Sequence, residues 1–128
     1  ANNHSRKGRL ALAMKYAHLC RVIANQGMMV VIVTISMFKE IHTWNRNNLP
    51  GYFEVYLKVP IEELRRRDPK DIYKRFDAGE LDNVAGLDLI ADEPLNADLV
   101  IEFDKLQTVN MIAEKLIIKL QEKKNKDG

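Results

Sequence analysis

Hydrophobic and polar residues alternate along this chain in blocks that predict helices separated by three short strands. Over residues 9–25 the apolar positions recur at helical spacing, and Gly27 follows as a stop. Residues 28–35 form a continuous, largely β-branched apolar run. Because an unbroken apolar strand is covered on both faces, this run predicts a buried strand of a parallel sheet. The polar residues 1–8 lack periodicity and predict a loop.

The rest of the chain continues the alternation of helices and strands. Pro60 opens one of the helices and Pro69 follows its end. The predicted elements are helices over 38–47, 61–67, 71–78 and 108–120, strands over 52–58 and 97–103, an irregular segment over 80–96 and a charged tail over 123–128. This order predicts an α/β fold with a parallel sheet and right-handed crossovers. The chain opens on a helix that should follow a strand, so we expect the first strand of the sheet to be missing from it.

Composition narrows the class of protein. A length of 128 residues suggests one domain, 1–128, and 46% hydrophobic with 30% charged residues is ordinary for a globular protein. The net charge of +2 is too weak to argue for nucleic acid, and no apolar run approaches a membrane span. No signal peptide is visible, and the single cysteine, Cys20, fits a reducing compartment. We expect a cytoplasmic protein with no membrane or nucleic-acid partner.

Two places carry candidate chemistry. Residues 62–74 form a basic segment interrupted by Pro69, and a hinged cationic segment on an α/β core suits closure over phosphates. The alternative is a solvated face, especially for Arg65 and Arg66. Ser36 follows the predicted strand 28–35, and ligands bind at the carboxyl edge of such sheets. Its alternative role is to cap the next helix.

Five short segments, taken in order, resemble one family. Their sequences are Ile-Ser-Met-Phe-Lys at 35–39, Phe-Glu-Val-Tyr at 53–56, Arg-Asp-Pro-Lys-Asp-Ile-Tyr-Lys at 67–74, Ala-Gly-Glu-Leu at 78–81 and Gly-Leu-Asp at 86–88. Together they are similar to the adenylyl-sulfate kinases over roughly residues 5–120. The Arg-Asp-Pro-Lys segment followed by Ala-Gly-Glu is the specific part of the resemblance.

The resemblance implies a three-layer P-loop NTPase fold of the nucleoside-monophosphate-kinase type, here lacking its first strand or strands. It implies transfer of the γ-phosphate of ATP to the 3′-hydroxyl of adenosine 5′-phosphosulfate, with Mg²⁺, in sulfate assimilation. The implied partners are nucleotide substrates and a second copy in a homodimer. Such catalysis rests on positioning and charge neutralisation.

The resemblance also implies roles for individual residues. The substrate-binding positions are Arg9, Ser36, Lys39, Val84 and Gly86, and the nucleotide-binding positions in a lid over about 67–92 are Arg67, Lys70 and Tyr73. Val84 replaces the phenylalanine that stacks on the substrate adenine, a loss of about 1–3 kcal/mol by analogy with other base stacking. Gly8, Leu12 and Met37 also depart from the family pattern. A kinase for another nucleotide or small hydroxylated acceptor is therefore an alternative.

No G-x-x-x-x-G-K-[ST] loop occurs in the sequence, so the catalytic residues are unknown. We favour a longer parent protein that carries this loop over a chain that is not a kinase by itself. The rival hypothesis is a non-catalytic binding or assembly module, and the upstream gene sequence discriminates between the two. The spacing of His4, His18 and His42 matches no zinc pattern, so no metal site is predicted.

Overall fold

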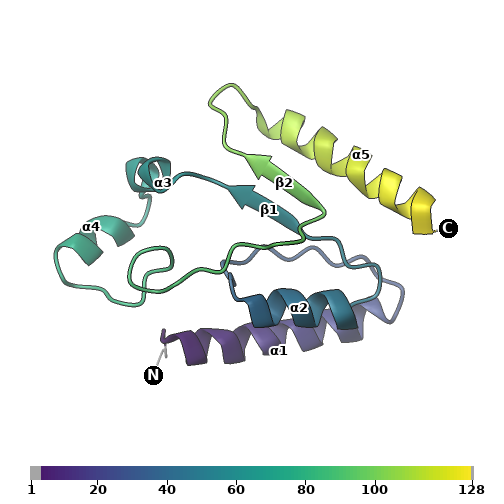
Figure 1. The fold of residues 1–128 in the computed structure, drawn as a ribbon, viewed down its shortest axis with the longest axis horizontal. Coiled ribbons are helices and arrows are strands. Elements are labelled where there is room, and N and C mark those ends of the chain that lie inside the picture. Colours follow the sequence, from purple (N-terminus) through teal and green to yellow (C-terminus); the bar gives the residue numbers. More distant parts are fainter. Residues whose placement is uncertain (1–3, 128) are drawn as a thin grey trace. The chain divides into compact units, whose positions relative to one another are not determined.

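The computed structural model describes residues 4–127, and its chain forms two compact units, whose elements are labelled in Figure 1. The first unit comprises Ala1–Tyr52 and Asp68–Pro94, and the second comprises Phe53–Arg67 and Leu95–Gly128. The elements in chain order are α1 (Arg6–Ala24), α2 (Lys39–Asn48), β1 (Val55–Lys58), α3 (Ile61–Arg67), α4 (Ile72–Asp77), β2 (Leu99–Glu102) and α5 (Val109–Asp127). No helix in the described part of the chain is long and apolar enough to cross a membrane.

Helix α1 begins earlier than predicted, so the prediction of a loop over 1–8 is wrong from Arg6 onward. The reason is a cap: the Ser5 side chain accepts a hydrogen bond from the Gly8 N–H at 3.2 Å, which satisfies a free donor of the first turn. At the other end Gly27 has a φ of 78°, which only glycine adopts without steric cost. A serine such as Ser5 just before a run of helix-forming residues is a known N-cap signal, which predicts a helix start here.

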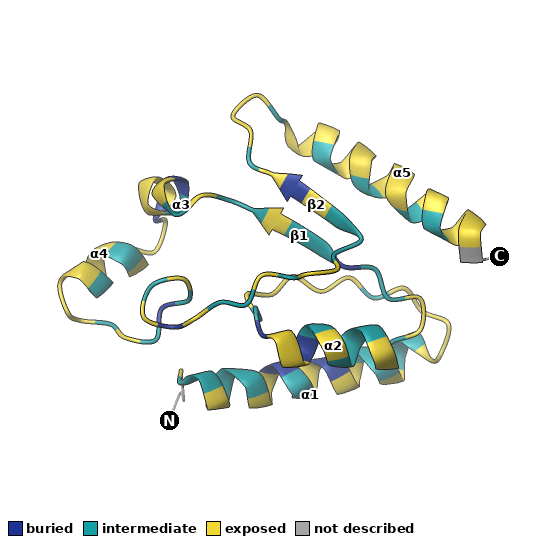
Figure 2. Ribbon diagram, viewed as in Figure 1, coloured by how far each residue is buried: buried dark blue, intermediate teal, exposed yellow. Residues whose placement is uncertain are grey.

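The core of the first unit lies between α1 and α2, which run side by side (Figure 1). Ala13, Phe38 and Ile41 are buried there, and Leu10 and Met14 pack against them. Figure 2 shows buried positions on both helices. The apolar positions predicted over 9–25 are buried at Ala13 and Ala17, whereas Val22 among them is 60% exposed. The core is small, so each of its large side chains contributes a large share of the unit's stability.

Residues 28–38 correct the prediction of a buried strand over 28–35. They form neither helix nor strand in the structure, and most of their side chains are exposed, Val31 at 83% and Val33 at 90% (Figure 2). A parallel strand exists only with a hydrogen-bonded neighbour, and no described segment pairs with this one. The residue pattern is that of a covered strand, whereas the structure leaves its apolar side chains uncovered.

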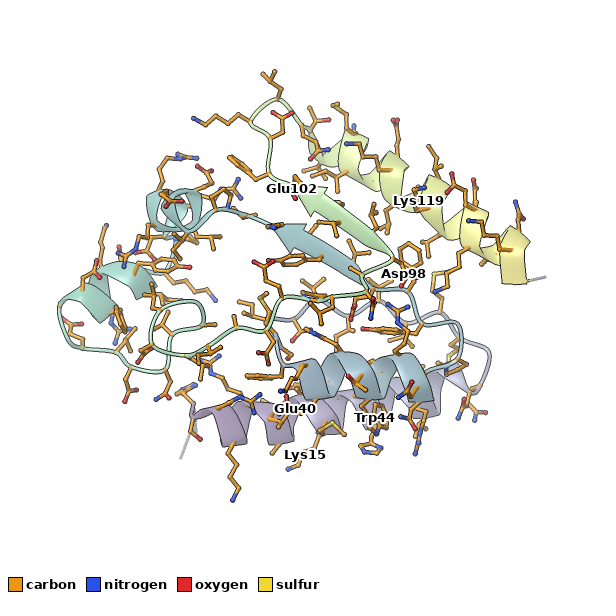
Figure 3. The ribbon with its side chains drawn as sticks, viewed as in Figure 1. Lys15, Glu40, Trp44, Asp98, Glu102 and Lys119 are labelled. Carbon is orange, nitrogen blue, oxygen red and sulfur yellow. The ribbon has the colours of Figure 1, made fainter. Side chains whose placement is uncertain are left out.

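The second unit contains a two-stranded parallel sheet, as predicted. β1 pairs with β2 in the register Val55–Leu99 to Lys58–Glu102. Asp98, labelled in Figure 3, joins the starts of both strands to α5: its carboxylate accepts the Glu54 N–H at 2.8 Å and the Lys123 ammonium at 2.8 Å. Because both carboxylate oxygens are used, Asp98 fixes the register from the amino end of the sheet.

Two expectations for the second unit are wrong. A glutamate in a predicted strand is expected to face solvent at the end of the sheet; Glu102 does so, but the Glu54 side chain is buried. Residues 123–128 were expected to form a tail, but α5 continues to Asp127. A 2.7 Å Lys119–Glu122 pair within the helix and a 2.8 Å pair between Lys123 and Asp98 support the extra turns. Helix α3 keeps its predicted bounds because prolines flank it.

Candidate functional site

A hollow in the first unit brings together two of the predicted substrate-binding residues. Arg9 and Ser36 line it, with a volume of about 280 Å³. Its other walls are Leu12, Ala13, Tyr16, Thr34 and Ile35. The Thr34 and Ser36 hydroxyls are 2.6 Å apart and form one hydrogen bond, in which either of them can be the donor. The hollow therefore combines a guanidinium and two hydroxyls with an apolar wall.

The loop that contains Val84 and Gly86 is tightly folded. One Asp88 carboxylate oxygen accepts the Asn83 N–H at 2.8 Å, and the other accepts the Val84 N–H at 2.7 Å. Asn83 and Gly86 have positive φ values of 56° and 83°, which the turn requires. Burial raises the pKa of Asp88, but the backbone hydrogen bonds together outweigh it and hold the pKa below its usual range. Val84 is buried inside the loop and presents no aromatic face.

Arg9 connects the two features. Its Nη2 donates to the Asn83 carbonyl at 2.9 Å, and its Nε donates to the His4 carbonyl at 2.9 Å. The structure thus brings Arg9, Ser36 and the Val84 loop together, although 74 residues separate Arg9 from Asn83. Much of the Arg9 hydrogen-bonding capacity holds the backbone. Its predicted contact with substrate stays a prediction.

Asp92 holds the end of the same loop against α2. Its side chain accepts the Lys39 N–H at 3.0 Å, and its own N–H donates to the Met37 carbonyl at 2.8 Å. Asp92 thereby caps the start of α2, which was one alternative role for Ser36. The N-cap residue of α2, Phe38, makes no capping hydrogen bond with its side chain. The Lys39 side chain is exposed beside this junction.

Arg6 reinforces the junction from α1. Its guanidinium donates to the Glu40 carboxylate at 2.8 and 3.0 Å, and Asp92 lies 3.5 Å away. The bond from Arg6 holds the pKa of Glu40, which is labelled in Figure 3, below its usual range. Because all three side chains are partly exposed, we assign the cluster to loop placement rather than to catalysis.

Arg9→Lys is expected to loosen the Val84 loop. A lysine reaches one carbonyl at most, so one charge-assisted bond is lost, at about 1 kcal/mol. Amide hydrogen exchange at Gly86 and Leu89, whose N–H groups bond within the loop, should quicken about fivefold. Lys7→Gln, an exposed change on the same helix, is the control. Unchanged exchange in Arg9→Lys would show that the loop holds itself.

The second unit carries an acidic group inside the basic helix end. Glu63 is buried, and its carboxylate accepts two bonds from Arg66 and one from Arg67, each at 2.7 Å. These bonds from Arg66, then Arg67, lower the pKa of Glu63 from 4.5 to about 2. Arg66 is therefore paired with Glu63, while 69% of its side chain stays exposed to solvent.

Glu63→Gln is expected to make the free energy of unfolding decline less steeply as the pH falls. An unfolded chain binds a proton at Glu63 near pH 4.5, whereas the folded protein does so only near pH 2. The contribution of Glu63 is therefore fully present above pH 4.5 and is lost as the pH falls towards 2. Urea unfolding across this range should show a steeper decline in the wild type than in the variant. Glu62→Gln, exposed on the same helix, should keep the wild-type decline; equal slopes in all three proteins would refute the assignment.

The predicted lid residues follow in sequence. Asp68 is buried and accepts the N–H groups of Tyr73 at 3.2 Å and Lys74 at 3.1 Å, so it caps α4. This cap explains the Asp-Pro-Lys-Asp spacing. Tyr73 is half-buried and Lys70 is exposed. Arg67 belongs to the second unit and the rest of the lid to the first, so closure of a lid over 67–92 stays a prediction.

Known proteins were compared with the chain. The family model for adenylylsulphate kinase matches residues 3–102. The chain belongs to the adenylylsulphate kinase family. It is 40% identical over 117 residues to cytidine diphosphoramidate kinase of Campylobacter jejuni subsp. jejuni, covering 91% of this chain and 68% of that protein. It is 28% identical over 90 residues to adenylyl-sulfate kinase of Pseudomonas aeruginosa, covering 69% of this chain and 46% of that one.

A solved family member has the same fold. The structure of the APS kinase of Mycobacterium tuberculosis, in complex with AMPPNP and APS, is 26% identical with a TM-score of 0.82, over 91% of this chain and 69% of that one. The predicted P-loop NTPase fold with a parallel sheet is thereby confirmed. The chain spans about half to two thirds of its relatives, so what the whole protein does is a matter of proposal.

Sequence reasoning missed the acidic residues that organise this adenylylsulphate-kinase-family site. Asp88 and Asp92 bond to backbone N–H groups, which no pattern of side chains in the sequence reveals. The pairing of Glu63 with Arg67 was readable from i, i+4 spacing on a helix. Within residues 4–127 no group of three or more His, Cys, Asp or Glu side chains could hold a metal ion.

Proposed function

We propose that the protein containing this chain is an ATP-dependent kinase whose acceptor is a cytidine nucleotide derivative of the cytidine diphosphoramidate type. The carrying observation is the 40% identity, over 91% of the chain, to a cytidine diphosphoramidate kinase. The buried Val84 supports it, since the stacking phenylalanine expected for an adenine-containing acceptor is absent at this position. A cytoplasmic location, where ATP is abundant, belongs to the proposal.

Adenosine 5′-phosphosulfate is the second candidate acceptor. The family model and the structural likeness to an APS kinase favour it. In this version the γ-phosphate of ATP passes to the 3′-hydroxyl in sulfate assimilation. The two candidates differ at the nucleobase, so the side chains of Leu12 and Tyr16, which line the hollow together with Arg9 and Ser36, would discriminate between them.

The roles proposed for the residues follow from charge. Arg67 and Lys70 would neutralise phosphates of ATP, and Tyr73 would be the third nucleotide-binding residue. Arg9, Ser36 and Lys39 would orient the acceptor. The loop at Val84 and Gly86 would close over the acceptor. The cationic groups lower the barrier by stabilising charge that spreads over the phosphoryl oxygens. Mg²⁺ would arrive with ATP and supply further charge neutralisation, held largely by phosphate oxygens.

We further propose that residues outside these 128 supply the phosphate-binding loop and a strand against residues 28–35. The uncovered apolar side chains of Val31 and Val33 support this, because folded proteins do not expose such an edge. The relatives are longer than the matched region, which also supports it. The upstream gene sequence tests it: a Gly-Lys-Ser/Thr loop is expected there, and an initiation codon next to Ala1 would favour a non-catalytic module.

An acceptor panel tests the function. The full-length protein is incubated with ATP and, separately, with cytidine diphosphoramidate, adenosine 5′-phosphosulfate, CDP or no acceptor, and ADP and the phosphorylated product are measured. We expect the cytidine diphosphoramidate reaction to be the fastest, by about tenfold or more, since base contacts of this size discriminate to that degree. Faster turnover of adenosine 5′-phosphosulfate would overturn the acceptor assignment. No acceptor-dependent ADP with any of them would overturn the kinase assignment.

A further inference from the structure

The guanidinium of Arg67 is held on two sides and open on the third. Its Nε donates to a Glu63 oxygen at 2.7 Å, and its central carbon lies 5.2 Å from the centre of the Phe103 ring. Within residues 4–127 neither of its two Nη groups has a hydrogen-bond partner. The side chain is 49% exposed. An arginine with an anchored Nε edge, a stacked face and open Nη groups is oriented to receive an anion.

Glu63 is itself buried and hydrogen-bonded to a second arginine. It is 7% exposed, and Arg66 holds it with two further hydrogen bonds at 2.7 Å. One carboxylate between Arg66 and Arg67 leaves a net positive charge at this helix end. The cluster therefore stays attractive to a polyphosphate after Glu63 is paired. Glu63 orients Arg67 without cancelling the positive charge that such a ligand needs.

Phe103 is fixed by the sheet. Its N–H donates to the Lys58 carbonyl at 2.9 Å, which extends the β1–β2 pairing by one residue. It also lines a hollow of about 300 Å³ at the carboxyl end of β2, whose polar walls are Glu102, Asp104, Gln107 and Lys115. Ligands of parallel α/β sheets bind beyond the carboxyl ends of the strands. Arg67 is thus stacked on a wall of a hollow at the ligand-binding edge.

We propose that Glu63 and Phe103 are positioning residues, which hold the Nη groups of Arg67 in place for the polyphosphate of ATP. This inference rests on the kinase function proposed above. Neither residue touches the nucleotide in this scheme. Each acts through Arg67, Glu63 by fixing the edge of the guanidinium and Phe103 by fixing its plane.

A double-mutant cycle tests the proposal in the full-length protein. Steady-state kinetics with varied ATP should give a KM about fivefold higher for Glu63→Gln, with kcat changed less than about twofold, because orientation of a binding group is lost. Glu62→Gln, its exposed neighbour, should match the wild type. In an Arg67→Ala background the Glu63→Gln change should have no further effect, which a merely structural role would not produce.

Phe103 provides an independent arm. Phe103→Leu should raise the KM for ATP about threefold and Phe103→Tyr should restore it, since the tyrosine ring keeps the stacking face. Equal effects of Glu63→Gln with and without Arg67, or no rescue by tyrosine, would overturn the proposal while leaving the kinase function intact. A wild-type protein that neither turns over nor binds ATP by calorimetry would instead overturn the kinase function, and the inference with it.

Discussion

Arg67→Ala is expected to lower kcat/KM for ATP by about 10- to 100-fold. The proposed interaction is a charge-assisted hydrogen bond from the open Nη groups to phosphate, and bonds to charged groups contribute about 1.5–3 kcal/mol. The variant removes the cation and leaves Glu63 bonded to Arg66 alone. Initial-rate kinetics with varied ATP, at a saturating concentration of the acceptor that the panel identifies, measure the effect.

Arg66→Ala is the matched control for that experiment. Arg66 is the adjacent arginine, shares the Glu63 carboxylate and is more exposed than Arg67, at 69% against 49%. Its removal lowers the local charge by the same amount, so a general electrostatic effect would appear in both variants. Because Arg66 also bonds to Glu63, we expect Arg66→Ala to lower kcat/KM by no more than about fivefold, the loss expected for Glu63→Gln. Equal losses in the two variants would mean that the helix end acts only through its summed charge.

Phe38→Ala is expected to lower the free energy of unfolding by about 3–5 kcal/mol, the usual range for a buried phenylalanine. Phe38 is 2% exposed, lies against Ala13 and Ile41, and has the Arg6 guanidinium 5.1 Å above its ring. Removal of the ring takes away the largest side chain of this core cluster. Urea unfolding followed by circular dichroism measures the loss.

Leu95→Ala is the control for Phe38→Ala. The Leu95 side chain is 93% exposed, so the substitution removes an apolar group that is not part of a core. We expect a change of less than about 0.5 kcal/mol. A loss below about 1 kcal/mol for Phe38→Ala would show that α1 and α2 do not depend on this cluster.

Local signals in the sequence predicted most of the helices and both observed strands. Pro60 and Pro69 fixed α3, and the alternation of strands and helices predicted parallel pairing, which β1 and β2 show. The cap at Ser5 that starts α1 is an equally local signal, but the predicted helix began only at residue 9. These features depend on residues within a few positions of one another, and such features are what a single sequence reveals best.

Features that depend on distant partners could not be predicted in this way. Residues 28–35 have the composition of a covered strand, but whether a strand forms depends on a neighbour and not on the segment itself. The Arg9–Asn83 bond joins residues far apart in the chain. Family resemblance alone suggested that Arg9 and Val84 serve one site. Nothing in the residue pattern pointed to Phe103 as the stacking partner of Arg67.

The bare apolar segment has a consequence for handling the isolated polypeptide. Residues 28–38 carry no charge and no proline, and β-branched side chains dominate the first eight. These are the properties of segments that stack into cross-β fibrils, and no lysine or glutamate interrupts them as a gatekeeper. If the polypeptide is prepared without a covering strand, we expect this segment to pair with the same segment of other copies, so that the protein aggregates.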